Sequence, residues 1–209
     1  RGMPMVVQAL AAGSIHFGCG GPEPFMESSD RSLDFVITGG VINNMTQFIV
    51  TGKKYKTFED LRGTTLGSSS LTGGPVTAFR EALRQKGLEY PRDYKLLVVA
   101  GGSPGNLAAL QSGQIAATTV AVPLNYAAEE LGFNSIGSLL EAVPQFQSAA
   151  LATRHSWAEK NRPLMVRFMK GMVQSLRWMH NNKDAAVEFL TKEIQLKPAH
   201  ALKGWEYYT

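Results

Sequence analysis

The stretch TTLGSSSLTGGP at residues 64–75 joins a strand-like run to a turn of small residues that ends in a proline. A helical pattern follows from Val76 to Lys86. Proline is tolerated at the first position of a helix because its missing N–H would have no partner there in any case. The stretch therefore predicts a strand, a turn and a helix that begins near Pro75.

The same order of strand, small-residue turn, proline and helix occurs at three further places. They are Ile15–Cys19 followed by Gly20, Gly21 and Pro22; Tyr94–Ala100 followed by Gly101, Gly102, Ser103 and Pro104, with a helix to Ser112; and Ile115–Ala121 followed by Val122 and Pro123, with a helix to Leu131. Strands that alternate with helices predict an α/β fold with a parallel sheet and right-handed crossovers. The carboxyl ends of such strands meet at one edge, where ligands of open α/β folds bind.

The C-terminal part of the chain has a helical period instead. From Pro163 an apolar stripe recurs at helical spacing, a second helix is predicted over Asp184–Ile194, and Pro198 opens a third. The stripe comprises Met165, Phe168, Met169, Met172, Leu176 and Met179. Methionine at this spacing usually fills gaps in a core, so core packing is favoured over a flexible ligand groove.

Two strand-like segments are not followed at once by a helix, namely Thr46–Thr51 and Ser148–Thr153. Between them lies a self-contained series of strands and helices from about Thr57 to Val143. A chain that leaves one lobe and later returns to it needs two crossing strands, and these two segments stand where the crossings are expected.

Composition excludes several classes of protein. The chain has 209 residues, 44% of them hydrophobic, and a net charge of +4 that is scattered along the sequence without the basic stripe of a nucleic-acid binder. The single cysteine, Cys19, rules out an internal disulfide and a multi-thiolate metal site. No apolar run approaches the roughly 20 residues that span a bilayer. Neither a metal nor a cofactor is expected.

An enzyme is disfavoured by the absence of a recognisable catalytic motif. The four histidines lie far apart without metal-ligand spacing, no G-x-S-x-G motif occurs, and the serine-glycine loop at residues 68–74 lacks the lysine of a phosphate-binding loop. The His residues are His16, His155, His180 and His200. No catalytic residue is assigned.

The predicted turns offer groups that hold a small ligand. A helix N-terminus leaves up to four N–H groups unpaired and carries about half a positive charge, which attracts anions. Ser69, Ser70 and Thr72 add hydroxyl groups, and Gly73 lets a ligand approach the backbone. For Ser70 and Thr72, ligand contact is favoured over capping, whereas Ser103 is equally suited to contacting a ligand and to capping the helix at Pro104.

Further candidates come from the first and fourth turns. Gly20 and Gly21 are candidate ligand contacts, and Val122 belongs to the same set. Glu23 falls in the first turn of a predicted helix, where a carboxylate usually stabilises the helix dipole; if it faces a ligand, that ligand carries donor or cationic groups. Cys19 is expected to be a small buried residue, because no base stands beside it in the sequence.

Three motifs resemble those of the substrate-binding proteins of nitrate, sulfonate, taurine and bicarbonate transporters, a group that includes binders of thiamine-pyrimidine precursors. The matching stretches are residues 8–18 (QALAAGSIHFG), Phe58–Gly63 (FEDLRG) and Ala108–Ala117 (AALQSGQIAA), the last followed by Val122-Pro123. The tail from His155 to Asn181 is similar to the family's lobe-closing helices. His16 and Ala116 stand where aspartates are common in that family.

The resemblance implies a bilobed, type II periplasmic-binding-protein fold. Lobe 1 would comprise residues 1–50 and 147–209, and lobe 2 residues 51–146. The first strand, an export signal and a C-terminal piece of lobe 1 would then lie outside the sequence.

The function implied is solute binding for an ATP-driven (ABC) uptake transporter. A monomer outside the cytoplasm would capture a small anionic or heterocyclic solute between its lobes, such as a sulfonate, nitrate, an aromatic acid or a pyrimidine. It would deliver the solute to membrane permease and ATPase subunits. Two alternatives stay open on the same fold: the effector-sensing domain of a transcription regulator and a pyrimidine-synthase-like enzyme. The helical tail favours transport over regulation.

Overall fold

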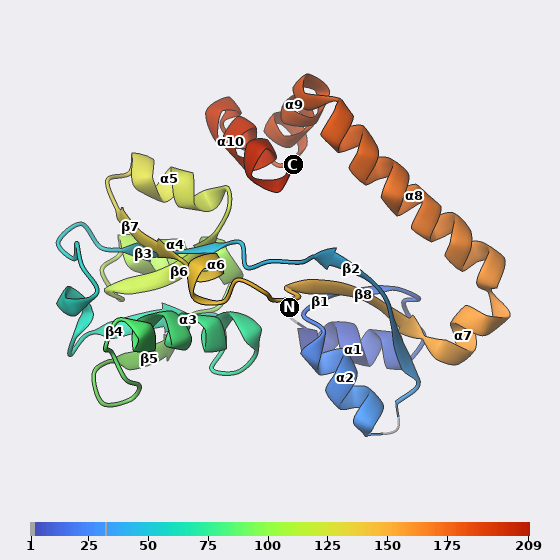
Figure 1. The fold of residues 1–209 in the computed structure, drawn as a ribbon, viewed down its shortest axis with the longest axis horizontal. Coiled ribbons are helices and arrows are strands. Elements are labelled where there is room, and N and C mark those ends of the chain that lie inside the picture. Colours follow the sequence, from blue (N-terminus) through green and yellow to red (C-terminus); the bar gives the residue numbers. More distant parts are fainter. Residues whose placement is uncertain (1–2, 32) are drawn as a thin grey trace. The chain divides into compact units, whose positions relative to one another are not determined.

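The computed structural model describes residues 3–31 and 33–209, and the chain divides into two compact units. Unit 1 consists of Arg1–Val41 and Ala149–Thr209, and unit 2 of Ile42–Ser148 (Figure 1). The lobe boundaries expected at residues 50/51 and 146/147 stay a prediction.

Unit 2 contains a five-stranded sheet in the order β5-β4-β6-β3-β7. Its elements are β3 (Gln47–Thr51), the 3₁₀ turn η1 (Glu59–Leu61), β4 (Thr65–Ser68), α3 (Gly74–Gln85), β5 (Lys95–Val98), α4 (Gly102–Gln111), β6 (Ala117–Ala121), α5 (Leu124–Glu130), β7 (Asn134–Ser138) and α6 (Leu139–Ala142). β4 pairs in parallel with both β5 and β6, which confirms the predicted parallel arrangement for these three strands. β3 pairs antiparallel with β6 and β7, so the whole sheet is mixed.

Apolar side chains fill both faces of this sheet. Successive residues of a strand point to opposite faces, and in β3 the buried Ile49 joins one core cluster while the buried Val50 joins the other. The first cluster includes Phe79 of α3 and Leu139 of α6, and the second includes residues of α4 and α5. Unit 2 is therefore a layered α/β structure with helices on both sides.

The predicted prolines mark the helix starts within two residues. Helices α2, α3, α4 and α5 begin at Glu23, Gly74, Gly102 and Leu124, close to Pro22, Pro75, Pro104 and Pro123. β7 was not predicted, because its sequence NSIGS is polar and rich in small residues.

Unit 1 contains a three-stranded sheet in the order β1-β8-β2 and a tail of helices. Its elements are α1 (Met3–Ala11), β1 (Gly18–Gly20), α2 (Glu23–Asp30), β2 (Phe35–Ile42), β8 (Ala149–Arg154), α7 (His155–Lys160), α8 (Arg162–Asn181), α9 (Lys183–Glu193) and α10 (Pro198–Tyr208). β1 is shorter than the predicted strand Ile15–Cys19 and pairs antiparallel with β8. The parallel sheet predicted for the first junction is therefore wrong.

The segment Thr46–Thr51, expected as a crossing, lies wholly in unit 2. That segment forms β3, a strand inside the unit 2 sheet, whereas the passage from unit 1 to unit 2 falls between Val41 and Ile42 in β2. The sequence of β2, FVITGGVI, carries two adjacent glycines that conceal its strand character. The return passage falls directly before β8, at the second predicted segment.

The apolar stripe of α8 does not form a core. No residue of this helix is buried, and Leu176 is 48% exposed. The main packing partners of α8 are α7 and α9, near its two ends. Phe168 stacks on Phe17 with ring centroids 3.8 Å apart, so the stripe is covered only locally. The predicted core packing of this stripe is wrong because helical periodicity shows which face of a helix is apolar. It does not show whether another element packs on that face.

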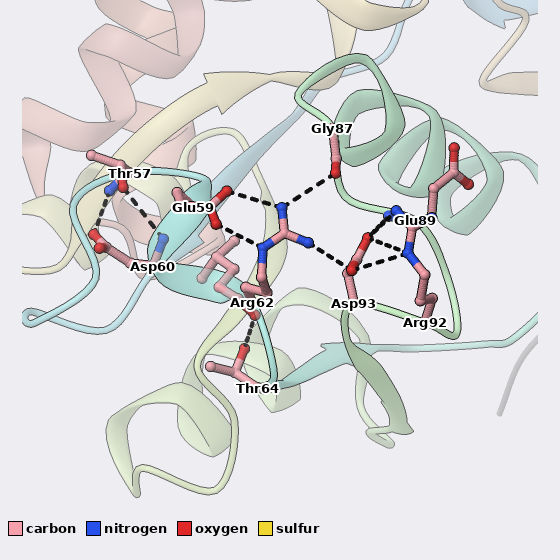
Figure 2. Close-up of polar contacts among 10 residues, drawn as sticks. Thr57, Glu59, Asp60, Arg62, Thr64, Gly87, Glu89, Arg92 and Asp93 are labelled. Carbon is pink, nitrogen blue, oxygen red and sulfur yellow. Dashed lines mark hydrogen bonds and ion pairs between the residues drawn. The ribbon is translucent and has the colours of Figure 1, made fainter.

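Arg62 and Asp93 join two connections of unit 2 (Figure 2). Nη1 of Arg62 lies 2.6 Å from Oδ1 of Asp93, and the guanidinium also bonds both carboxylate oxygens of Glu59. Asp93, only 8% exposed, accepts further bonds from Arg92 and from the backbone N–H of Glu89. The network fixes the turn before β4 against the loop before β5, at the edge where these strands begin.

The hydrogen bonds from Arg92 and from the Glu89 backbone hold the pKa of Asp93 well below its usual range, and the charge of Arg62 adds to the effect. A carboxyl group with a lowered pKa in the folded state stabilises the protein above the pKa of the unfolded chain, about 3.9, and loses that contribution as the pH falls further. We expect Asp93→Asn to lower the melting temperature at pH 7, and the difference from the wild type to shrink below about pH 4. Thermal unfolding across pH 2–7 measures this, with the exposed Asp30→Asn as control; a difference that does not change with pH would contradict the assignment.

Candidate ligand-binding site

Three loops of unit 2 start at one edge of its sheet. Because β4 pairs in parallel with β5 and β6, the carboxyl ends of all three strands lie side by side. The loops β4–α3, β5–α4 and β6–α5 leave from this edge, as the sequence predicted. β3 runs in the opposite direction, so its first residue, Gln47, lies opposite Ala121 at the same edge.

No charged residue occurs in the two segments that supply these loops. Residues 63–79 and 96–128 contain no Asp, Glu, Lys or Arg. Neutral hydroxyls, amides and backbone groups are therefore the polar groups that these loops present. An anion bound here would be held by N–H and O–H donors, without a side-chain cation to neutralise it. Helix N-termini can bind an anion through such N–H donors.

In the loop between β4 and α3, the hydroxyl groups hold the turn and stay exposed. The backbone N–H of Thr72 donates to Oγ of Ser70 over 3.1 Å, and the Ser70 and Thr72 hydroxyls lie 3.4 Å apart, where either can donate to the other. Ser69, Ser70 and Thr72 are exposed, and no side chain caps α3. Gly73 has φ +92°, a conformation that suits glycine, and its carbonyl accepts from the N–H of Thr77. Capping of α3 by Ser70 or Thr72 is thus not observed.

The loop between β5 and α4 is held tightly to its neighbour β6. Oγ of Ser103 accepts the backbone N–H of Ala121 over 3.0 Å, and Nδ2 of Asn106 donates to the carbonyl of Thr119 over 3.1 Å. Ser103 is therefore not the cap of α4, which begins one residue before it. Its hydroxyl sets the spacing between two of the three loops.

The loop between β6 and α5 is short and largely buried. Val122 is 6% exposed and donates its N–H to the carbonyl of Thr46 over 3.0 Å, which ties the end of β6 to the start of β3. Pro123 follows, and α5 begins at Leu124. This loop offers its backbone rather than the Val122 side chain to a ligand.

Sequence reasoning missed three residues near this edge. Among the described residues, the side-chain oxygens of Asn125, Gln47 and Asn106 are buried and have no hydrogen-bond partner. Asn125, in the first turn of α5, is 1% exposed. A buried acceptor without a partner is costly, so each is expected to meet water or a ligand group. The sequence signal that could have identified Asn125 is its position two residues after the proline that opens α5.

In unit 1, the turn after β1 carries Gly20, Gly21 and Glu23. A Cβ atom added at Gly21 would lie 2.7 Å from Oε2 of Glu23, so the carboxylate folds back over this turn. Glu23 is the acidic residue in the first turn of α2, the place where a carboxylate stabilises the helix dipole. A Cβ at Gly20 would collide with the Met3 sulfur, so α1 packs directly on that glycine.

Cys19 is exposed, and its predicted burial is wrong. It lies in β1 opposite Leu151. Partial burial nevertheless raises the pKa of its thiol, which leaves less reactive thiolate at neutral pH.

The described residues contain neither a cluster of metal ligands nor a membrane-spanning helix. Across 3–31 and 33–209, His, Cys, Asp and Glu side chains nowhere gather in the groups of three or more that could hold a metal ion. None of the described helices is both long and apolar enough to cross a membrane.

The sequence matches a family model described as NMT1/THI5 like over residues 3–186. The chain belongs to this family. No curated protein matches the chain at a significant level.

Solved structures of binding proteins share the fold of this NMT1/THI5-like chain. The alkanesulfonate-binding protein SsuA from Xanthomonas axonopodis pv. citri, bound to MOPS, matches with a TM-score of 0.80 and 19% identity over 98% of this chain and 70% of that chain. The periplasmic aliphatic sulphonate-binding protein SsuA from Escherichia coli matches with a TM-score of 0.77 and 20% identity over 98% and 69%. The periplasmic nitrate-binding protein NrtA from Synechocystis PCC 6803 matches with a TM-score of 0.76 and 15% identity over 94% and 57%. These matches confirm the predicted α/β periplasmic-binding-protein-like fold.

The packing of the loop between β5 and α4 requires a glycine at position 105. A Cβ atom there would collide with the carbonyl oxygen of Ala100, whereas a Cβ at Gly171 in α8 would meet no atom within 4 Å. Both glycines lie inside helices, so alanine improves helix propensity at each. We expect Gly105→Ala to lower the free energy of unfolding by about 1–3 kcal/mol through overpacking, and Gly171→Ala to raise it by about 0.5–1 kcal/mol.

Urea unfolding measures both changes. Equal effects of the two substitutions would contradict the close packing of the loop on α4.

Proposed function

We propose that this protein is the solute-binding component of an ABC uptake transporter and that it performs no catalysis. One observation carries the proposal: three loops built from uncharged polar residues and glycines start at the carboxyl edge of parallel strands. This is the edge where open α/β sheets bind ligands. Membership of the NMT1/THI5-like family and the fold shared with sulfonate- and nitrate-binding proteins support it.

The proposed contacts in unit 2 are those predicted from the sequence, with Asn125 added. Ser69, Ser70, Thr72 and Gly73 present hydroxyl and backbone N–H donors, and Asn125 presents an acceptor. Ser103 and Val122 hold the loops in place through their bonds to Ala121 and Thr46. We propose that a small solute rich in acceptor atoms, such as a sulfonate or nitrate, binds these donors.

The turn of unit 1 that carries Gly20, Gly21 and Glu23 is proposed as a ligand-contacting segment of its own unit. Gly20 and Gly21 would offer backbone groups, and the carboxylate of Glu23 would repel an anion close to it. A solute that reaches this turn is therefore expected to present a neutral or donor-bearing part there, as an amino group or a heterocycle does.

The other proposed functions on this fold have less support. The chain's solved relatives named above are binding proteins. The helical tail favours transport over regulation, and no lysine stands out as the catalytic residue of a pyrimidine-synthase-like enzyme. The proposed partners are a membrane permease and its ATPase, and the proposed location is outside the cytoplasm.

A thermal-shift screen tests the proposal with MOPS, nitrate, benzoate and an aminopyrimidine as probes. A ligand that binds only the folded protein at 100 times its Kd adds about 2.7 kcal/mol to stability, which raises the melting temperature measurably. We expect at least one probe to do so. Ser70→Ala with Thr72→Ala should remove most of that shift, because it deletes the exposed hydroxyl donors.

The matched control is Ser175→Ala, which deletes a hydroxyl bonded to the Gly171 carbonyl in α8, far along the chain from these loops. It should leave the shift unchanged. A stabilising probe whose shift survives the Ser70 and Thr72 substitutions would place the solute elsewhere, and a screen without any stabilising probe would count against solute binding of this class.

A further inference from the structure

A second group of polar side chains lies in unit 2 where β5 begins, at the opposite end of this strand from its candidate loop. Tyr94 immediately precedes β5, Tyr90 lies in the connection before it, and Arg80 comes from α3. Cζ of Arg80 lies 4.4 Å from the centroid of the Tyr90 ring, and the Tyr90 and Tyr94 ring centroids are 5.7 Å apart. The three side chains form one cluster, called the Arg80 cluster below.

Arg80 differs from the other arginines of unit 2. Of the four arginines in residues 42–148, Arg62, Arg84 and Arg92 each bond a carboxylate oxygen, at 2.6, 2.8 and 2.7 Å. Across 3–31 and 33–209, no carboxylate forms an ion pair with Arg80, and its Nε is buried without a hydrogen-bond partner. A buried donor without a partner is costly, so an acceptor from outside the chain would stabilise Arg80.

The hydroxyl group of Tyr94 is a second donor of this kind. Tyr94 is 2% exposed, and its hydroxyl oxygen has no hydrogen-bond partner within the part of the chain that the structure describes. Burial raises the pKa of Tyr94 to about 12, so the hydroxyl keeps its proton at neutral pH and can donate it. Buried tyrosine hydroxyls are normally bonded. Two donors of one cluster, from α3 and from the residue before β5, therefore lack an acceptor.

The charges around the cluster favour an acceptor with a single negative charge. Glu89 and Asp93 both add negative potential at Tyr94, and Asp93 is already bonded by two arginines (Figure 2). The guanidinium of Arg80 is the one cation of the cluster, so a doubly charged anion would be repelled by Glu89 without a second cation to offset this. A carboxylate carries one charge, and its planar shape matches the donor fork of a guanidinium.

We propose that Arg80 and Tyr94 form a second anion site of unit 2, separate from the candidate solute site, and that this site binds a carboxylate group. The carboxylate would accept hydrogen bonds from the Arg80 guanidinium and from the Tyr94 hydroxyl. The Tyr90 ring holds the guanidinium from one face through a cation–π contact. The carboxylate belongs either to a free organic acid or to an acidic side chain of a protein partner.

The Nε–H signal of Arg80 in ¹H–¹⁵N NMR spectra tests the proposal, and its loss in Arg80→Lys identifies it. Sodium acetate is expected to move this signal until the site is saturated, whereas sodium chloride at the same ionic strength is not. Tyr94→Phe should weaken acetate binding about tenfold, because a hydrogen bond to a charged group is lost. Without acetate, Tyr94→Phe should not lower the melting temperature, because the deleted hydroxyl has no partner.

The matched control is Arg84→Gln, one turn further along α3, where the guanidinium already bonds Glu81. It should leave acetate binding at Arg80 unchanged. Ser70→Ala with Thr72→Ala should leave it unchanged as well, which separates this site from the candidate solute site.

A blocked tripeptide of glutamate distinguishes the two sources of the carboxylate. Tighter binding of the tripeptide than of acetate supports an acidic side chain of a protein partner, and equal or weaker binding supports a free organic acid. Three results would overturn the proposal: an Arg80 signal that acetate moves no more than chloride does, an acetate affinity that is unchanged in Tyr94→Phe, or a melting temperature that Tyr94→Phe lowers without acetate.

Discussion

The parallel pairing of β4 with β5 and β6 is the constraint on which the candidate site depends. It aligns the ends of three strands, which stop at Ser68, Val98 and Ala121, so that loops far apart in sequence start side by side. The pairing is held from both faces by the buried side chains of Leu66, Phe79 and Val120. At the opposite edge of the sheet, the Arg62–Asp93 network fixes where β4 and β5 begin. The loops start from fixed positions because the strands beneath them pair in a single register.

Within that frame the loops differ in how firmly they are held. Ser103 and Asn106 bond β6, and Gly105 allows the carbonyl of Ala100 to pack on α4, so the β5–α4 loop is fixed on two sides. In the β4–α3 loop, Ser69 to Thr72 are exposed and held mainly by the bond between Thr72 and Ser70. Exposed loops with few backbone hydrogen bonds open at low free-energy cost. The β4–α3 loop is thus the part best suited to adjust to a solute.

The sequence predicted the parts of this fold that follow from local chemistry. The prolines located four helix starts because proline lacks the N–H that a helix interior needs. Periodicity failed where partners far along the chain decide the outcome. The two adjacent glycines concealed the strand β2, the apolar stripe of α8 is only partly covered, and Cys19 is exposed in β1. Likewise the buried acceptor of Asn125 depends on how α5 packs, which no spacing reveals.

The measurement that tests the proposed site most directly is amide hydrogen exchange with and without the probe that stabilises the protein most. The proposed site requires slower exchange on binding in residues 69–74, 101–105 and 122–126 of unit 2. Protection confined to the helical tail, or spread evenly over the chain without a maximum in these loops, would contradict it.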